Sequence, residues 1–528
     1  MKPIPLFGTS LASFQGTQLS AQSRLNCYYE IRPDQDKNQI VIKGTPGTTV
    51  ATGSGAGLPG GFICAWLYEL NGSYSAYLYV VTDTGFYHCS GSDLTIWTKA
   101  TGPFAGGSTA TYTTQMSSNG TQVFVWDGSF GWIYTIATNT IAQITDANFP
   151  PTAGRMFVAF LDGRFTVNSP FTNQFYSSGS FDGTQWGANA AVSPLIFNTK
   201  SARPDRLQAV YAFHDTLVIF GSQSIEYWQD TGSYPNPYSR IPGTTQDFGL
   251  AAIDSVAVVN NSLMFVATNP QGQCTVMKLQ GYVPQSVASN DVLNYINNAS
   301  TPAGALQAVS YVVDGHSFYQ LNAPFSFGGN TPNGFSMLYD DTTGMWSFIG
   351  GDSLISGSYT YHNMRLALAW EQNKILAARN DSSGGAHVPI YFLSNAGSSD
   401  ILNYLISNTP PYSMRRQVVS RHIYGEGNYI YISELQLDMV VGSTYGPNVN
   451  IILEISRDGG NTFESPRNAQ LSSSGQYLSS SFLNRVIWRR IGAAFDFVFR
   501  FTLTHDSGQF IINKAVARVK NPEQVREK

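Results

Sequence analysis

The sequence predicts an all-β protein, in which a β-propeller of six or seven blades is followed by a C-terminal antiparallel β-sandwich or platform. Three observations support this prediction. Helical periodicity is almost absent from the 528 residues. A unit of strand, turn and strand recurs every roughly 45 to 60 residues between about residues 50 and 400. From about residue 415 onward the expected strands lengthen and the repeat stops.

Each repeat begins with alternating apolar residues, the pattern of a half-buried strand. The seven runs begin near Phe62, Thr109, Met156, Leu207, Ile253, Leu306 and Met364. A turn and a second apolar strand follow each run, and the segments LQAVYAFHDTLVIF and LQAVSYVVDGHSFYQL share one register. Four strands and their turns take about 40 to 50 residues in a propeller blade, so the spacing favours a propeller.

Four turns place an aspartate four or five residues before an aromatic residue. The pairs are Asp93 and Trp97, Asp182 and Trp186, Asp341 and Trp346, and Asp458 and Phe463. The Asp side chain accepts hydrogen bonds from backbone N–H groups ahead of it, and the aromatic ring packs beneath the turn. The motif therefore predicts stable hairpin turns and requires no substrate.

Two segments depart from the repeat. SNDVLNYINNAS (289–300) predicts one short helix with Ser289 or Asn290 as its N-cap. The long strands near the C-terminus predict the sandwich. The resulting division is an N-terminal arm or platform segment over residues 1–48, a propeller over 49–412 and a C-terminal platform domain over 413–528.

The composition restricts the possible partners and compartment. Charged residues make up 12% of the chain, about half the usual share, so uncharged polar groups or partner proteins must cover much of the surface. A net charge of −4 gives no electrostatic reason for tight, sequence-independent DNA binding. The N-terminus lacks the apolar core of a signal peptide, and apolar runs reach only about ten residues, so we expect no membrane segment.

The cysteines indicate a reducing compartment. Cys27, Cys64, Cys89 and Cys274 show neither CxxC spacing nor the density of a disulfide scaffold. We therefore expect four free thiols.

One motif resembles part of an enzyme. Ser456, Asp458, Gly460, Thr462 and Phe463 fit the S-x-D-x-G-x-T-[WF] pattern of the Asp-box, best known from sialidase propellers. A sialidase also needs an arginine triad, a Tyr nucleophile activated by Glu and an acidic general acid. This box lies outside the predicted blades, and the blade arginines follow no blade-to-blade pattern. We interpret the five residues as a structural hairpin turn.

Other catalytic motifs are incomplete. GDSL at 351–354 spells a hydrolase nucleophile block, but it lies mid-chain in an all-β region and no D-x-x-H follows it. The seven histidines are dispersed without metal-ligand spacing, and no GxxxxGK[ST] loop is present. The sequence therefore predicts a protein that is not an enzyme and that has no catalytic residues, metal site or cofactor.

Several stretches resemble the packaged-DNA stabilisation proteins of short-tailed bacteriophages, also called tail hub or tail nozzle proteins. LVIFGSQSIEYWQDTGS (217–233) is similar to that family's FG-x-x-[ST]-I-E-Y/W segment, and RVIWRRIG (485–492) is similar to its R-V-x-W-[RK]-R-[LIV]-G block. Weaker matches are NCYYE (26–30), GTPGTTV (44–50) and IPGTTQDFGLAAIDSVA (241–257). Their order and spacing agree with the family along nearly the whole chain.

The resemblance implies a homohexameric ring in the tail of a virion that is assembled in the host cytoplasm. The ring would lie below the portal and its adaptor ring and form the last section of the DNA channel, which stays closed until ejection. The implied partners are further copies of the chain, the head-to-tail adaptor ring, a tail needle or plug, tail fibre or tailspike proteins, and passing viral DNA bound without sequence specificity. Low charge agrees with large subunit interfaces, since charged residues are depleted at interface cores.

The C-terminal block contains three arginines that we predict as candidate interface residues: Arg485, Arg489 and Arg490. In one interpretation they are solvated or locally paired while Trp488 fills the sheet core. In the other, Arg489 and Arg490 lie at a subunit or adaptor contact, where guanidinium groups pair with acidic partners. We also expect a neutral or negative channel wall, along which DNA slides without sticking.

Two alternative functions remain open. Exposed Tyr and Trp side chains on loops can stack on sugars, so a carbohydrate- or receptor-binding propeller is the first alternative. A sialidase-like glycoside hydrolase is the less favoured one.

Overall fold

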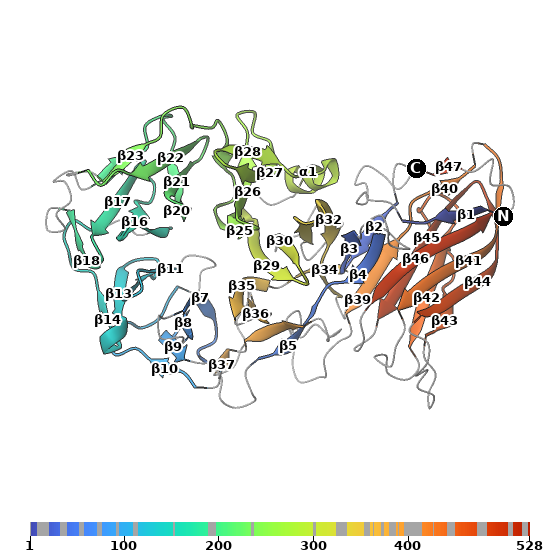
Figure 1. Ribbon diagram of the computed structural model, residues 1–528, viewed down its shortest axis with the longest axis horizontal. Coiled ribbons are helices and arrows are strands. Elements are labelled where there is room, and N and C mark those ends of the chain that lie inside the picture. The colour runs from blue at the N-terminus through green and yellow to red at the C-terminus, as the bar shows by residue number, and fades with distance from the viewer. Residues whose placement is uncertain are drawn as a thin grey trace.

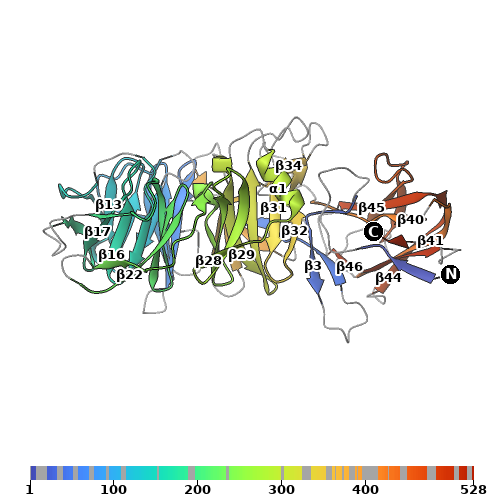
Figure 2. The same cartoon turned by 90° about the horizontal axis from the view of Figure 1, so that it is seen from above.

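A computed structural model shows a propeller and a β-sandwich side by side along the long axis of the molecule (Figures 1 and 2). Most of the described chain is strand, and the predicted all-β fold class is confirmed. The structure describes residues 2–7, 21–31, 40–51, 58–70, 76–90, 94, 96–108, 114–150, 154–187, 197–233, 237–298, 303–323, 335–352, 359–362, 364–370, 374–379, 387–388, 390–394, 414–425, 427–440, 449–471, 483–504, 510–519 and 526–527.

Seven antiparallel blades form the propeller, with their inner strands toward the ring centre, and the sheet of blade six continues into the sandwich (Figure 1). Blade one consists of β7 (Ile63–Leu70), β8 (Ala76–Thr82), β9 (Gly85–Ser90) and β10 (Thr98–Lys99). Blade two consists of β11 (Gln115–Ser118), β12 (Gln122–Trp126), β13 (Gly131–Thr135) and β14 (Thr140–Gln143). Blade three consists of β15 (Val158–Leu161), β16 (Arg164–Asn168), β17 (Gln174–Gly179), β18 (Asp182–Trp186) and β19 (Phe197–Thr199). Blades four and five consist of β20 (Leu207–Phe213), β21 (Thr216–Gly221), β22 (Ile225–Asp230) and β23 (Tyr238–Arg240); and β24 (Gly249–Leu250), β25 (Ala257–Val259), β26 (Ser262–Thr268), β27 (Cys274–Gln280) and β28 (Val283–Ser286). Blades six and seven consist of β29 (Gln307–Val313), β30 (His316–Ala323), β31 (Phe335–Asp340) and β32 (Met345–Phe348); and β35 (Met364–Trp370), β36 (Lys374–Arg379), β38 (Tyr391–Ser394) and β5 (Gly47–Val50).

The outer strand of blade seven comes from the N-terminal part of the chain. Strand β5 pairs antiparallel with β38, so Tyr391 lies opposite Val50. The buried Arg365 of β35 then joins this blade to blade one, donating to the carbonyls of Ile63 and Cys64 at 2.8 and 2.9 Å. Backbone from both ends of the propeller region therefore closes the ring.

Side chains from three successive blades interact with one another. Arg155 precedes the inner strand of blade three and forms an ion pair with Asp254, which precedes the inner strand of blade five. Blade four lies between them, and its Tyr211 is close enough to interact electrostatically with both charges. Burial raises the pKa of Asp254 to about 6 against the opposing effect of Arg155. An ion pair between a partly exposed arginine and a buried aspartate thus links blades three and five.

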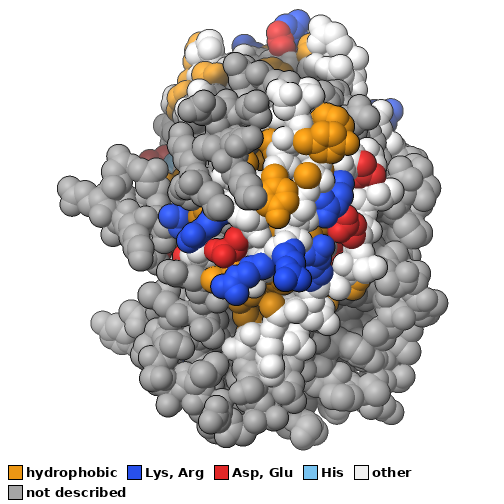
Figure 3. All heavy atoms as spheres, turned by 90° about the vertical axis from the view of Figure 1, so that its right-hand side faces the viewer, with side chains coloured by type: hydrophobic (Ala, Val, Ile, Leu, Met, Phe, Trp, Pro, Cys, Tyr) orange, Lys and Arg blue, Asp and Glu red, His pale blue; other side chains and the backbone are white. Residues whose placement is uncertain are grey.

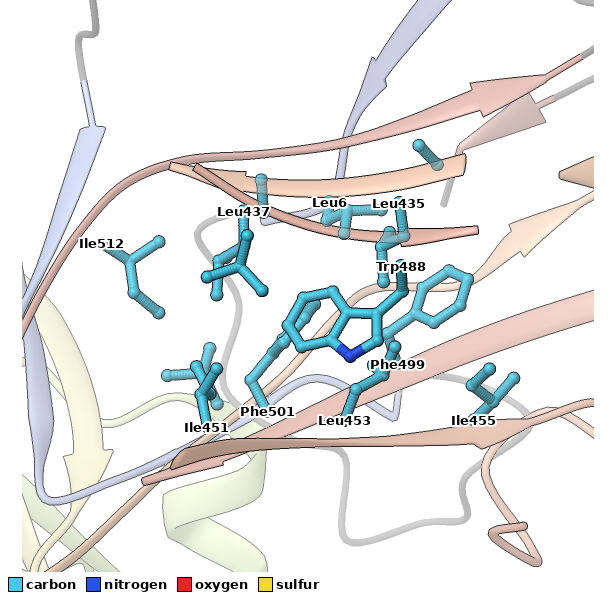
Figure 4. Close-up of a cluster of buried hydrophobic side chains, with 14 of the residues drawn as sticks. Leu6, Leu435, Leu437, Ile451, Leu453, Ile455, Trp488, Phe499, Phe501 and Ile512 are labelled. Atoms are coloured by element: carbon cyan, nitrogen blue, oxygen red, sulfur yellow. The ribbon is translucent and has the colours of Figure 1, made fainter. Parts of the chain in front are cut away.

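The sandwich combines strands from both ends of the chain. One sheet contains β1 (Lys2–Pro5), β3 (Cys27–Ile31), β4 (Ile40–Gly44), β46 (Ile511–Val519), β41 (Ile430–Val440) and β44 (Leu483–Ala494). The other contains β2 (Ser23–Leu25), β39 (Arg415–Val419), β45 (Asp496–Thr504), β40 (Ile423–Tyr424), β47 (Arg526–Glu527), β42 (Asn450–Ser456) and β43 (Arg467–Gln470). Their facing apolar side chains form one core around Trp488, as Figure 4 shows.

Strand β2 connects the two domains. It pairs with β39 of the sandwich on one edge and with β32 of blade six on the other. Next to it, Asn26 adopts a left-handed backbone (φ 55°) and donates from Nδ2 to the carbonyls of Gly350 and Arg415, both at 2.8 Å. Its Oδ1 accepts the N–H of Gly350 at 2.9 Å. Hydrogen bonds therefore run from the propeller through β2 into the sandwich.

The remaining elements are short. Helix α1 (Asn290–Asn297) begins after Ser289, whose hydroxyl accepts the N–H of Val292 at 3.4 Å, so the predicted helix is confirmed with Ser289 as its N-cap. Two further strand pairs join β33 (Gly350–Asp352) to β34 (Tyr359–Tyr361) and β6 (Leu58–Pro59) to β37 (His387–Val388). The expected divisions at residues 48/49 and 412/413 stay predictions. No helix of the described residues is long and apolar enough to cross a membrane.

Candidate assembly surface

The three predicted interface arginines belong to strand β44. Arg485 lies opposite Asp438 and Arg489 lies opposite Glu434 in the register with β41. Arg490 follows at an irregularity of the pairing, has a positive φ of 58° and is exposed. The strand therefore places Arg485 and Arg489 at alternate positions of one face, while Arg490 leaves that alternation.

Arg489 shares a carboxylate with an arginine of a third strand. Its Nε lies 3.7 Å from Glu434 Oε2, and Arg518 Nε lies 3.4 Å from Glu434 Oε1. Arg518 and Lys514 alternate along β46, opposite Glu434 and Asp438. Acidic positions on β41 are thus flanked by basic positions on both neighbouring strands.

Sequence reasoning missed the contribution of β41 and β46 to this surface. The basic residues of KAVAR stand four positions apart, so they share a face of one strand, but nothing local shows which strands pair. Apolar side chains share the surface, because Tyr431 and Ile487 remain 40% and 38% exposed. Figure 3 shows the sandwich end of the molecule, where Lys and Arg side chains gather next to acidic and apolar ones.

Trp488 points to the opposite side of β44. It is buried in the sandwich core, with its ring centroid 5.9 Å from that of Phe501 (Figure 4). The RVIWRRIG block therefore serves two purposes, since Val486, Trp488 and Ile491 fill the core while Ile487, Arg489 and Arg490 are exposed.

The Asp-box forms the turn between β42 and β43. Both carboxylate oxygens of Asp458 accept the N–H of Thr462, at 2.9 and 3.1 Å, and Oδ2 also accepts its hydroxyl at 2.6 Å. Ser456 donates to Asp458 at 2.7 Å and accepts the N–H of Gly460 at 2.8 Å. The hydrogen bonds from Thr462 and Ser456 lower the pKa of Asp458 to about 2. Every side-chain oxygen of the box is used within the turn, and the guanidinium of Arg500 covers the Phe463 ring at 3.8 Å.

The segment SIEYW in blade four surrounds a buried lysine. Lys200 forms an ion pair with Asp205, donates to Ser224 Oγ at 2.6 Å and lies 4.0 Å from Glu226 Oε1. Glu226 accepts the N–H of Ala202 at 2.7 Å. These contacts fasten the crossing from blade three to blade four, which explains the polar residues of that segment by packing. The role of the lysine was not visible in the sequence, because Ser224 and Glu226 follow it only after β20 and β21.

Three of the four predicted hairpin turns lie within the described residues, and one aspartate was misassigned. Asp182 accepts from Thr184 as expected, at 2.9 Å. In DDTTGMW, however, Asp340 accepts the N–H of Thr342 at 3.0 Å, while Asp341 accepts from Lys278 of blade five at 2.6 Å. The prediction of Asp341 as the turn residue is wrong, because its side chain points to the neighbouring blade. Asp93 lies outside the described residues.

The enzyme motifs assemble no reaction centre in the described part of the chain. Ser353 and Leu354 of GDSL lie outside it. No group of three or more His, Cys, Asp or Glu side chains that could hold a metal ion occurs among the described residues. None of the four cysteines forms a disulfide, and burial raises the pKa of Cys27 and of Cys64 to about 12. Such thiols are mostly protonated at neutral pH and are poor nucleophiles.

Solved structures of other proteins resemble this chain only distantly. The extracellular domain of the hybrid two component system BT4673 from B. thetaiotaomicron is 7% identical, with a TM-score of 0.38, over 74% of this chain and 43% of that one. A chain of the Mitotic Checkpoint Complex is 10% identical, with a TM-score of 0.37, over 69% and 98%. The N-terminal domain of Nup159 is 8% identical, with a TM-score of 0.36, over 73% and 99%. No curated protein matches the sequence.

Family models give a specific match. The model described as the β-propeller of bacteriophage P22 Gp10 matches residues 70–324, and the model described as its β-sandwich matches residues 415–520. The two models occur in the order in which the propeller and the sandwich occur here. The chain belongs to the bacteriophage P22 Gp10 family of packaged-DNA stabilisation proteins, which are structural components of the phage particle.

Proposed function

We propose that this chain is a subunit of a homohexameric nozzle or hub ring in a short phage tail, below the portal and its adaptor ring. The ring closes the DNA channel, retains the packaged DNA and conducts it during ejection. The observation that carries the proposal is the match of both domain models to one packaged-DNA stabilisation family. The interlocked domains support it, since a channel component must hold its shape against the packaged DNA.

The DNA path in this proposal lies between subunits. Because Arg155 and Asp254 link blades three and five by an ion pair inside the propeller, we place the conduit in the central opening of the ring and not in the propeller itself. We propose that the wall of this opening is neutral or negative and binds the passing DNA without sequence specificity. Clustered Lys and Arg side chains along the wall would contradict this part of the proposal.

The candidate interface arginines provide the attachment. Arg489 is 76% exposed and only loosely paired with Glu434, so its remaining N–H groups are available to an acidic partner. We propose that Arg485, Arg489 and Arg490 contribute to a contact with a neighbouring subunit or with the adaptor ring. A needle or plug and tail fibre or tailspike proteins complete the set of proposed partners.

Genetic complementation tests the proposed function. Particles assembled without this chain should fill with DNA and then lose it, which nuclease protection of the packaged genome measures. A tagged copy should appear by electron microscopy in a six-fold ring at the tail. Arg489→Ala should reduce DNA retention while its circular dichroism stays that of the wild type, and Arg203→Ala, which removes another exposed arginine, is the control.

Two results would contradict the proposal. Particles that keep their DNA without the chain would exclude a role in retention. A tag found away from the tail, together with binding of the purified chain to a glycan array, would favour the carbohydrate- or receptor-binding alternative. Release of fluorophore from a sialoside substrate would favour the glycosidase.

A further inference from the structure

The outer face of β41, β44 and β46 has a striped pattern of charge, and we call it the basic face. Its central strand is acidic, and both flanking strands are basic and partly apolar. Its described outward residues include Tyr431, Glu434, Asp438, Ile487, Arg489, Lys514 and Arg518, with Gln436 donating to Asp438 Oδ1 at 2.8 Å. Aromatic and arginine side chains of this kind are enriched at protein interfaces.

The charges of the basic face leave capacity for a partner. Glu434 serves two guanidinium groups at 3.4 and 3.7 Å, distances too long for full hydrogen bonds. Arg518 and Lys514 are both exposed. An added carboxylate could therefore pair with either arginine without breaking a strong existing contact.

The stripe also restricts the kind of partner. A DNA backbone carries phosphate at every step, so the carboxylates of Glu434 and Asp438 in the middle of the face would repel it. A second basic face is disfavoured too, since its flanking rows of positive charge would oppose each other. The face instead fits a protein surface with separate carboxylates and an apolar contact.

Such a surface occurs on the propeller of this same chain, where three aspartates cluster on the turns of blades three and four. Thr216 of β21 lies opposite Gln229 of β22 in an antiparallel pair. Asp215 and Asp230, one residue further along each segment, therefore lie opposite each other. Asp230 pairs in turn with Tyr238, whose hydroxyl donates to the carbonyl of Leu161, next to Asp162. Burial and the charges of Asp230 and Asp215 raise the pKa of Asp162. We call Asp162, Asp215 and Asp230 the acidic turns.

An apolar side chain accompanies the acidic turns. Phe181 is 61% exposed, and its N–H donates to the carbonyl of Gly163 at 2.6 Å, so it lies beside Asp162. Arg164 follows the same turn, but its Nη1 donates to the carbonyl of Ser178 at 2.8 Å. The acidic turns thus combine separate carboxylates with an exposed ring, which complements the basic face.

The two surfaces lie toward opposite ends of the molecule. Blades three and four form the left end in Figure 1, and the sandwich with the basic face forms the right end. One chain therefore cannot bring its own surfaces together. A contact between unlike surfaces of two copies is heterologous, and it is the type that can close into a ring.

We infer that the basic face of one copy docks on the acidic turns of the next, with Arg489, Lys514 and Arg518 paired to the aspartates and Tyr431 or Ile487 against Phe181. This inference rests on the proposed ring and names the surfaces that build it. It also predicts that the contact weakens as salt increases, because exposed charges are screened within about 10 Å at 0.1 M salt.

Charge reversal on each surface tests the contact. The first variant carries Arg489→Glu and Arg518→Glu together with Glu434→Lys, so that alternating charge is kept within the sheet. The second carries Asp215→Lys and Asp162→Asn, because asparagine tolerates the left-handed backbone at position 162 (φ 48°). Circular dichroism and thermal unfolding verify that both full-length variants fold, and Arg203→Ala is an exposed control variant.

Light scattering after gel filtration measures assembly. We expect the wild type and the control to assemble, and each reversed variant alone to assemble at least about 100-fold more weakly. An equimolar mixture should assemble again, because each reversed surface then meets its reversed complement. The inference is overturned if the first variant assembles like the wild type, or if the mixture stays as weak as its components. If these variants assemble normally while the tagged chain still marks a tail ring, only the surfaces named here are wrong and the proposed function stands.

Discussion

Replacing Lys200 by methionine tests the argument that the blade-four segment is held by a buried charge cluster. Methionine keeps most of the length and volume of the side chain but removes the ammonium group. Lys200 is fully buried, and its partners Asp205 and Glu226 are 4% and 0% exposed at their side chains. The substitution therefore leaves two carboxylates buried without their cation.

The expected loss follows from the contacts that remain. Removing one partner of a buried ion pair usually costs about 3 to 5 kcal/mol. Asp205 still accepts the N–H of Gln223 at 2.8 Å, and Glu226 still accepts those of Ala202 and Trp228, at 2.7 and 3.0 Å. These bonds partly compensate the carboxylates, so we expect the lower end of the range, about 3 kcal/mol.

Urea unfolding followed by tryptophan fluorescence measures this loss, since Trp228 lies inside the affected blade. Arg203→Ala is the matched control, because it breaks an ion pair with Asp247 in which both side chains are more than half exposed. Such a pair contributes at most about 1 kcal/mol. If Lys200→Met is no more destabilising than this control, the buried cluster does not hold the crossing and the reasoning is refuted.

Three further predictions concern the ion pair of Asp254 with Arg155, the domain junction and the Asp-box. Because the pKa of Asp254 is raised to about 6, this residue contributes fully to the free energy of unfolding below about pH 4, and the contribution of about 3 kcal/mol is lost as pH rises through about 6. Asp254→Asn should remove this pH dependence from a series of unfolding curves, and an unchanged series would contradict the assignment. Asn26→Ala should lower the free energy of unfolding by about 3 kcal/mol, because three hydrogen bonds are lost and alanine must adopt a left-handed backbone. Calorimetry should then show separate transitions for the propeller and the sandwich, and one unchanged transition would exclude the proposed coupling. Asp458→Ala should lower stability by no more than about 1 kcal/mol, because the turn is exposed, and should leave phage infectivity intact, so that a non-infectious yet folded variant would show a role beyond the turn.

Local patterns predicted the blades well. Of the expected first strands, those at Leu207 and Met364 begin where the structure has them, and the others begin within a few residues, except near Thr109, where residues 109–113 are not described. The alternation of buried and exposed side chains acts over a few residues, so it is visible in sequence. The N-cap at Ser289 was predictable for the same reason.

Long-range pairing was not predictable. Nothing near Gly47–Val50 shows that this strand completes a blade with Tyr391–Ser394, and nothing near Ser23–Leu25 shows that it lies between two domains. The same limit applies to the candidate surface. Arg489 was singled out from its own strand, but its neighbour Arg518 became visible only through the register that both strands share with β41.

The N-terminal segment has a consequence for the order of folding on the ribosome. Strand β5 waits for residues 391–394, and β1, which pairs Lys2 with Val519, waits for almost the entire chain. Loops of this length close slowly, since the entropy of bringing distant segments together is lost before the contacts form. The propeller can therefore close once residues 391–394 are available, whereas the sandwich stays open at one edge until β46 is made. A nascent chain stalled before β46 should consequently remain sensitive to protease at β1.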